Sequence, residues 1–172
     1  MNNVMIDLET MGTGRNAAIV AIGAVKFDKS GLGEEYYVKI SLVEACMFGM
    51  EMTAETVLWW LKQSDEARAE LTDGKTTCVY QVIEDFEHFL GDDAVVWGNG
   101  SDFDNVILAE LWLSQDLQVP WKFWNSQCYR TIKNTNRDVP FNRVGVHHNA
   151  LDDARSQAAH LVEIAYAKNI PL

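Results

Sequence analysis

Residues 1–40 read MNNVMIDLETMGTGRNAAIVAIGAVKFDKSGLGEEYYVKI and contain three apolar runs rich in β-branched and aromatic residues. The runs cover residues 3–8, 17–28 and 34–40, and the segments between them are short and contain glycine. Runs of this composition are typical of strands, and short glycine-containing gaps are typical of hairpin turns. The sequence therefore predicts that the chain begins with an antiparallel meander of three strands.

Beyond this meander the apolar pattern takes the period of helices. We expect helices over residues 53–63, 78–90, 103–115 and 128–134, and a long amphipathic helix over 147–170. The run AVVWGN at 94–99 is short, apolar and followed by Gly100, which is typical of a buried parallel strand. A further strand is expected near 121–125.

The predicted order of elements is β-β-β-α-β-α-β-α, which combines hairpin-linked strands with crossover helices. This order implies a mixed five-stranded sheet covered by helices, of the α/β or α+β class, with three antiparallel strands followed by parallel ones. Such a sheet carries its site where strand ends meet helix starts. Because no repeat or linker interrupts the 172 residues, we expect one domain, 1–172.

The composition, 48% hydrophobic and 23% charged, is ordinary for a soluble globular protein. We expect no membrane span, because the sequence lacks a run of about 18 uncharged apolar residues. The first ten residues have no basic start and carry acids inside the apolar run, so they indicate a strand rather than a signal peptide. Three cysteines, distant from one another, fit reduced thiols in a cytoplasmic protein.

The net charge of −11 bears on the class of partner. An acidic chain repels a polyanion at long range, which argues against a protein that coats nucleic acid. It does not exclude an enzyme that gathers carboxylates to bind cations, because bound cations reverse the local charge.

Asp7 and Glu9 lie two positions apart at the end of the first apolar run. Side chains two apart on a strand point to the same face, so both carboxylates project together. Like charges this close raise each other's pKa unless a cation lies between them. The pair is a candidate metal site, although D-x-E alone is equally compatible with a structural role.

Asp104 opens the helix predicted after AVVWGN. A carboxylate at a helix N-terminus is stabilised there, so capping is the alternative role. Asp102, two residues earlier, is the better cap. We therefore expect Asp104 to face the strand ends, with Phe103 packing beside it.

The segment HNALDDA at 148–154 begins the last predicted helix. Histidine is the side chain best suited to take a proton from water near neutral pH, which makes His148 a candidate base. Asp153, five positions later, lies among alanines that allow close packing on the sheet. The adjacent His147 and Asp152 are the alternatives in this motif.

Together, IDLETMGTG (6–14), NGSDFDNVIL (99–108) and HHNALDDA (147–154) resemble the three motifs of the DEDDh exonuclease superfamily, in the same order. This superfamily includes DnaQ-like proofreading exonucleases and RNase T. The small size and the form of the second motif are most similar to the phage and prophage-type branch, whose members are termed exodeoxyribonuclease VIII-like or 3′ exoribonuclease-like.

The resemblance implies a ribonuclease H-like fold and metal-dependent hydrolysis from the 3′ end of single-stranded DNA or RNA, which releases nucleoside 5′-monophosphates. It implies two divalent cations, Mg²⁺ or Mn²⁺, held by carboxylates. Asp7 would contact both ions. Glu9 and Asp153 would complete the site of the attacking water, and Asp104 would serve the second ion. His148 would deprotonate the nucleophile.

Six residues are expected to contact the substrate: Thr10, Met11, Gly12, Trp59, Trp60 and Phe103. The first three match the family segment that contacts the terminal nucleotide, and Met11 is expected to press on its base. The aromatic residues offer stacking surfaces. Neighbours on a helix point about 100° apart, so we expect one tryptophan in the core and the other near the site. Which of the two faces the site stays open.

Lys133, Arg137 and Arg143 precede the third motif, where a loop could bring them to phosphates, although a solvated loop is the alternative. Several relatives work as homodimers, so a pairing surface is a further implication. The competing functions are a catalytically idle interaction module and a metal-dependent phosphatase or nucleotide hydrolase, which would release inorganic phosphate.

Overall fold

The computed structural model of the protein describes residues 1–72, 74–100 and 102–172. The strands are β1 (Asn3–Thr10), β2 (Ile19–Asp28), β3 (Gly31–Lys39), β4 (Val95–Gly98) and β5 (Ser126–Cys128). The helices are α1 (Leu42–Met47), α2 (Ala54–Trp60), α3 (Asp65–Thr72), α4 (Val79–Leu90), α5 (Asp104–Leu113), α6 (Tyr129–Thr135) and α7 (Ala150–Lys168), with a 3-10 turn η1 (Phe123–Asn125).

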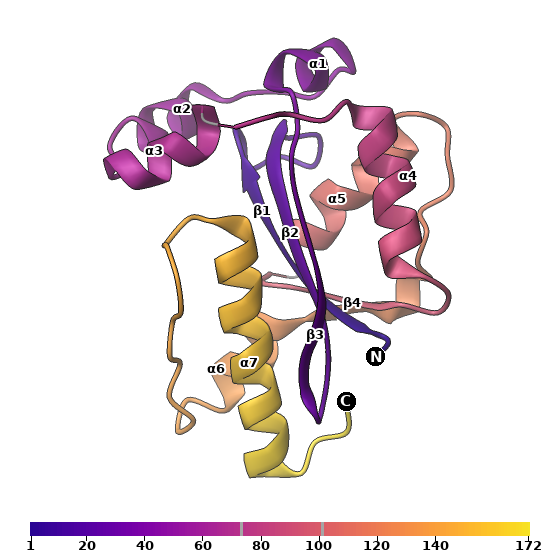
Figure 1. Cartoon of the computed structure of the whole chain (residues 1–172), viewed down its shortest axis with the longest axis vertical. Coiled ribbons are helices and arrows are strands. Elements are labelled where there is room, and N and C mark those ends of the chain that lie inside the picture. Colours follow the sequence, from indigo (N-terminus) through magenta and orange to yellow (C-terminus); the bar gives the residue numbers. More distant parts are fainter. Residues whose placement is uncertain (73, 101) are drawn as a thin grey trace.

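The five strands form one mixed sheet in the order β3-β2-β1-β4-β5. β1, β2 and β3 pair antiparallel, whereas β4 runs parallel to β1 and β5 parallel to β4. This topology confirms the predicted meander and the parallel strand at 94–99 (Figure 1). β1 is the central strand, and all but one of its residues are buried.

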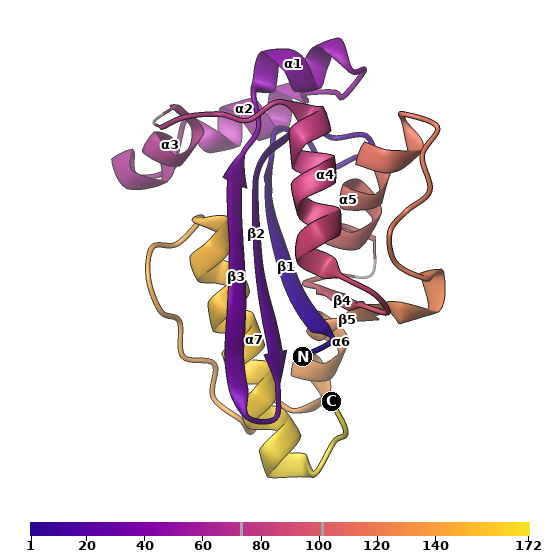
Figure 2. The same cartoon turned by 45° about the vertical axis from the view of Figure 1, so that its right-hand side comes forward.

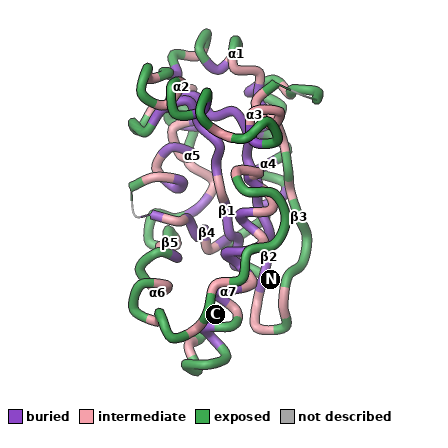
Figure 3. Tube along the Cα trace, turned by 90° about the vertical axis from the view of Figure 1, so that its left-hand side faces the viewer, coloured by how far each residue is buried: buried purple, intermediate pink, exposed green. Residues whose placement is uncertain are grey.

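Helices cover both faces of the sheet, with α4 and α5 on one side and α7 on the other (Figure 2). Alternation along β1 sends Val4, Ile6 and Leu8 into the core under α4 and α5. Met5 packs instead against α7, in a cluster that includes Ala154 and Ala158. β1, β2 and β4 are mostly buried and lie inside a largely exposed outer layer (Figure 3). No helix in the described part of the chain is long and apolar enough to cross a bilayer.

α7 packs on β2 at very close range, and a glycine makes this possible. A Cβ added to Gly23 would lie 2.2 Å from the carbonyl carbon of Ala150 and 2.3 Å from its oxygen. Ala150 is the first residue of α7 and is itself buried. The glycine at this position therefore sets how closely the start of α7 approaches the sheet.

We expect Gly23→Ala to lower the free energy of unfolding by about 3 kcal/mol, the upper part of the range for overpacked cores, because backbone atoms cannot rotate away. Urea denaturation measures the loss. Gly14→Ala is the matched control, since the nearest atom to its added Cβ lies 3.9 Å away. Equal stabilities of the two variants would show that the contact is not tight.

The structure also corrects the sequence-based elements. The strand expected near 121–125 is wrong: Phe123–Asn125 form a 3-10 turn, and β5 begins at Ser126. Trp121 is buried against Trp112, and its indole N–H donates to Ser126 Oγ at 2.9 Å. The apolar character at this position thus serves the core and not a strand. Helices α1 and α3 were not expected.

Candidate active site

The C-terminal end of β1 lies near α2 and the start of α7 (Figure 1). Residues of these three elements line a cavity of about 800 Å³. Of the residues expected from the sequence, Asp7, Glu9, Thr10, Gly12, Trp59, Trp60, Phe103, His148 and Asp153 line it. Asp104 and Met11 are not among the described residues on its wall. Four segments far apart in the sequence therefore meet at one cavity.

Asp7 and Glu9 project from β1 toward α7, as strand alternation predicts. Asp7 Oδ1 accepts a hydrogen bond from Gln157 Nε2 at 2.7 Å. Burial, then the charges of Asp104 and Glu9, raise the pKa of Asp7 well above its ordinary value. Burial, then Asp104 and Glu70, raise the pKa of Glu9 to about 8. Without a cation, the folded protein thus disfavours full ionisation of this pair.

Asp104 lies at the start of α5 with 2% of its surface exposed. Its carboxylate accepts the backbone N–H groups of Leu8 at 3.3 Å and Asn99 at 2.7 Å, which tie β1 to the end of β4. Burial raises the pKa of Asp104 to about 6, against the lowering effect of these N–H groups. The expectation that Asp102 caps this helix is wrong, because Phe103 is the N-cap residue and Asp102 is exposed.

Asp153 lies in the first turn of α7 and is 6% exposed. Its Oδ2 accepts the backbone N–H of His148 at 3.2 Å, and Arg143 forms an ion pair with its Oδ1. Asp152 has a different role, because its Oδ2 accepts the N–H of Val146 at 2.9 Å and so fixes the preceding loop. The two adjacent carboxylates, Asp152 and Asp153, therefore have different partners in the structure.

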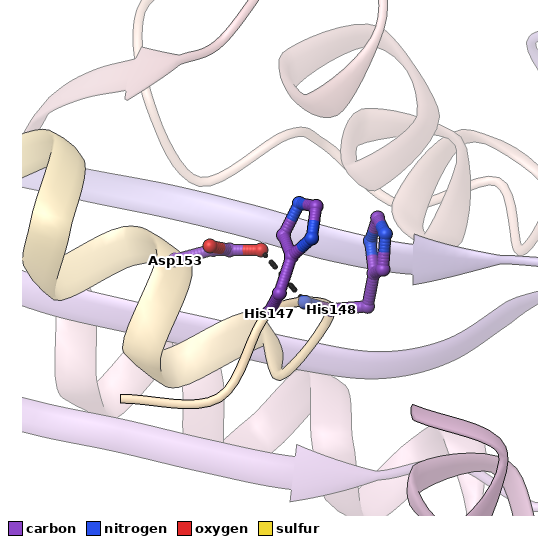
Figure 4. A group of neighbouring side chains, drawn as sticks. All are labelled: His147, His148 and Asp153. Atoms are coloured by element: carbon purple, nitrogen blue, oxygen red, sulfur yellow. Dashed lines mark hydrogen bonds between the residues drawn. The ribbon is translucent and has the colours of Figure 1, made fainter. Parts of the chain in front are cut away.

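His148 lies just before α7 with a left-handed backbone, φ 65°. Its ring packs edge-on against Trp59 and Trp60, with centroid distances of 5.0 and 5.9 Å. The ring of His147 stacks on it at 3.7 Å (Figure 4). Burial lowers the pKa of His148, with smaller contributions from His147 and Arg143, so its imidazole is neutral and can accept a proton at neutral pH.

The two tryptophans of α2 divide as expected, since one of them is in the core. Trp60 is 3% exposed and its indole N–H donates to the carbonyl oxygen of Thr10 at 2.9 Å. Trp59 is 42% exposed and presents its ring beside His148. Trp59 is thus the more accessible of the two rings. Met11 is 7% exposed and belongs to the hydrophobic core, so its side chain is not placed to press on a base.

Gln157 is a site residue that the sequence reasoning missed. It is 4% exposed, donates to Asp7, and its Oε1 is buried with no hydrogen-bond partner among the described residues. One signal was present in the sequence: Gln157 follows Asp153 by four positions, which places both on one face of a helix. Arg130, which donates to Asn99 Oδ1 at 3.4 Å, also lines the cavity and was not expected.

Carboxylate oxygens of Asp7, Glu9 and Asp153 lie within 4.8 Å of one another and can hold a metal ion. The largely buried, all-oxygen donor set and the raised pKa values fit a hard divalent cation such as Mg²⁺ or Mn²⁺.

The metal-free protein is expected to lose stability as the pH rises from about 5 to 8. Glu9 holds an extra proton in the folded state between its ordinary pKa of 4.5 and about 8. Folding therefore takes up a proton in this window, and the free energy of unfolding falls by about 1.4 kcal/mol per pH unit.

Thermal unfolding in EDTA across this pH range measures the slope, and saturating Mg²⁺ or Mn²⁺ should flatten it, because the ions stabilise the ionised form. Glu9→Gln removes one of the titrating groups and should make the slope in EDTA shallower, while the raised pKa values of Asp7 and Asp104 keep part of it. An unchanged slope in that variant would assign the proton uptake to other groups.

The sequence and the fold of the chain are similar to those of known exonucleases. A family model described as the 3′-5′ exoribonuclease Rv2179c-like domain matches residues 2–165. The chain is 27% identical over 161 residues to an exodeoxyribonuclease of Enterobacteria phage T4, covering 76% of this chain and 70% of that protein.

Solved structures show the same fold. One is exonuclease X in complex with 5′ overhanging duplex DNA, with a TM-score of 0.61, 16% identity, and 97% and 93% of the two chains covered. Another is the nuclease domain of 3′hExo, a DEDDh family member, bound to rAMP, with a TM-score of 0.62, 12% identity and coverages of 96% and 92%. These likenesses confirm the predicted ribonuclease H-like fold.

Proposed function

Because the chain belongs to the family of Rv2179c-like 3′-5′ exoribonuclease domains, within the DEDDh 3′-5′ exonuclease superfamily, we propose that it removes nucleotides from the 3′ end of single-stranded nucleic acid by two-metal hydrolysis. The observation that carries this proposal is the convergence of Asp7, Glu9 and Asp153 with His148 on one cavity. The products are nucleoside 5′-monophosphates.

The four carboxylates Asp7, Glu9, Asp104 and Asp153 would together bind two Mg²⁺ or Mn²⁺ ions. Asp7 would contact both ions, Glu9 and Asp153 would complete one site, and Asp104 would serve the other. When bound, the ions supply stabilisation of the attacking and leaving oxygens of the phosphodiester. Gln157 donates to Oδ1 of Asp7 and so fixes the orientation of this carboxylate.

His148 acts as the general base toward the attacking water. Its neutral imidazole has a free electron pair at neutral pH, and the rings of Trp59 and Trp60 restrict its movement. The backbone bond from His148 to Asp153 holds the base close to a metal-binding carboxylate. This bond therefore fixes the position of the proton acceptor, His148, relative to the metal ligands.

The rest of the cavity suits the end of a strand. The exposed ring of Trp59 and the ring of Phe103 offer faces for the terminal base, and such stacking contributes roughly 1–3 kcal/mol per base. Arg130 and Arg143 line the same cavity and supply positive charge for phosphates in a chain whose net charge is −11. Thr10 and Gly12 also line the wall.

The test uses 5′-labelled RNA and DNA of matched sequence, single-stranded and duplex, with Mg²⁺, Mn²⁺ or EDTA. Stepwise shortening from the 3′ end of single strands with release of monophosphates is expected, and the relative rates assign RNA or DNA preference. Asp104→Asn, purified in parallel, excludes a contaminating nuclease. Release of inorganic phosphate would indicate the phosphatase alternative, and no EDTA-sensitive product on either polymer would contradict an exonuclease.

A further inference from the structure

A second set of potential ligands lies beside the carboxylates of the site. His147, His148 and Asp153 each offer one ligand atom, and these three atoms lie within 4.8 Å of one another. Figure 4 shows the two imidazoles and the carboxylate side by side, at the turn that leads into α7. This group differs in chemistry from Asp7, Glu9 and Asp153, which offer oxygen atoms only.

The local backbone brings these three side chains together. His148 has a φ of 65°, and its N–H donates to Asp153 Oδ2 at 3.2 Å, so the turn is closed on the carboxylate. The two rings stack at a centroid distance of 3.7 Å with an interplanar angle of 23°. His147 is exposed, which leaves an approach from solvent. The three side chains are therefore held near one another and are accessible, and a rotation of the two rings would turn their nitrogens toward a shared ion.

Two imidazole nitrogens and one carboxylate oxygen form a donor set that Zn²⁺ prefers and Mg²⁺ does not. Zn²⁺ binds three such ligands and keeps its fourth position for water. We propose that His147, His148 and Asp153 form a zinc site, and that occupation of this site blocks the active site. The inhibitory part rests on the proposed exonuclease function.

Asp153 already accommodates a positive charge at this position, because the guanidinium of Arg143 forms an ion pair with its Oδ1. A carboxylate has two oxygens and about four lone-pair sites, so it can accept a second cationic partner or exchange one for another. Zinc can therefore bind Asp153 beside Arg143 or in its place.

Inhibition follows from the two residues that the zinc site shares with the reaction. A nitrogen of His148 that binds zinc cannot accept a proton from water. Asp153, bound to zinc, is withdrawn from the Mg²⁺ or Mn²⁺ set that it forms with Asp7 and Glu9. One ion would thus remove a base and a metal ligand at once.

The binding test uses the full chain and Co²⁺ as a spectroscopic substitute for Zn²⁺. A four-coordinate site with imidazole ligands gives intense visible bands, whereas ions held by carboxylates and water with six ligands give weak ones. We expect intense bands in the wild-type protein, removed by one equivalent of Zn²⁺. His147→Gln should lose these bands and weaken Zn²⁺ binding by at least about tenfold, since even outer-shell changes cost 10–100-fold.

His88→Gln is the matched control, because His88 is an exposed histidine on α4 outside the cavity. It should keep both the bands and the affinity. Unchanged bands and affinity in His147→Gln, or weak bands in the wild type, would overturn the zinc site. These spectra do not depend on turnover, so they decide the site even if the protein degrades no polymer.

The inhibition test adds Zn²⁺ to the Mg²⁺-dependent assay. Wild type and His88→Gln should be inhibited together, and His147→Gln should require at least about tenfold more Zn²⁺, in line with its lost affinity. Equal inhibition of the three proteins would overturn the link between this site and inhibition, while leaving the exonuclease proposal intact.

Discussion

Asp7→Asn should reduce the rate of 3′-end shortening by about 10³-fold or more, with the fold retained. A metal ligand that supports both ions supplies several kcal/mol of transition-state stabilisation, and each 1.36 kcal/mol is about tenfold in rate. Asparagine keeps the shape of aspartate and still accepts the bond from Gln157, so the change removes charge without removing the contact. Single-turnover kinetics at saturating Mg²⁺ measures the loss.

The same variant should unfold at an equal or higher temperature in EDTA. Asp7 carries a raised pKa because burial and the charges of Asp104 and Glu9 oppose its ionisation, and the substitution relieves that cost. Asp102→Asn, at an exposed position outside the cavity, is the matched control and should keep wild-type activity. A severe drop in the unfolding temperature of Asp7→Asn would indicate a structural carboxylate.

His148→Ala should lower the rate by about 10²–10⁴-fold, the usual contribution of a general base. Its effect on Mn²⁺ affinity, measured by calorimetry, should be small by comparison. In the wild type the rate should fall with decreasing pH as His148 becomes protonated, at a pH below the ordinary histidine pKa, because burial lowers its pKa. The variant should lose this limb of the pH profile.

His147→Ala is the paired control, and it should retain most of the activity in the absence of zinc. The two histidines are adjacent and stacked, so a purely structural effect of losing a ring should appear in both variants. A greater loss of rate in His147→Ala would assign the base to His147 and shift the third motif by one residue.

The main frame of the fold could be predicted because its signals are local. Apolar runs separated by glycine-containing turns marked β1 to β3, and helical periodicity marked α4, α5 and α7. The strand predicted near 121–125 was misplaced, because the apolar Trp121 packs against Trp112 and is not part of a strand. α1 has only six residues, too few for a periodic signal.

The candidate site, like the fold, could be predicted only where its signals lie within one segment of the sequence. Spacing within one element placed Asp7 beside Glu9 and Asp153 near His148. Contacts between elements could not be predicted from the sequence. One is the hydrogen bond from the amide of Gln157 to Asp7. Another is the burial of Met11, because the direction of its side chain depends on how the chain leaves β1. Asp102 was favoured as a cap by residue type, whereas the backbone places Phe103 there.

The hydrogen bond between Gln157 and Asp7 joins residues 150 positions apart. Contacts of such separation form only after the chain has met a large entropic cost of closure, so they belong to the late part of folding. A refolding chain can therefore pair the strands of its sheet, with Asp7 and Glu9 already side by side on β1, before Asp153 on α7 joins them. Recovery of metal binding during refolding would then report the docking of α7, and it should lag behind the circular dichroism of the strands.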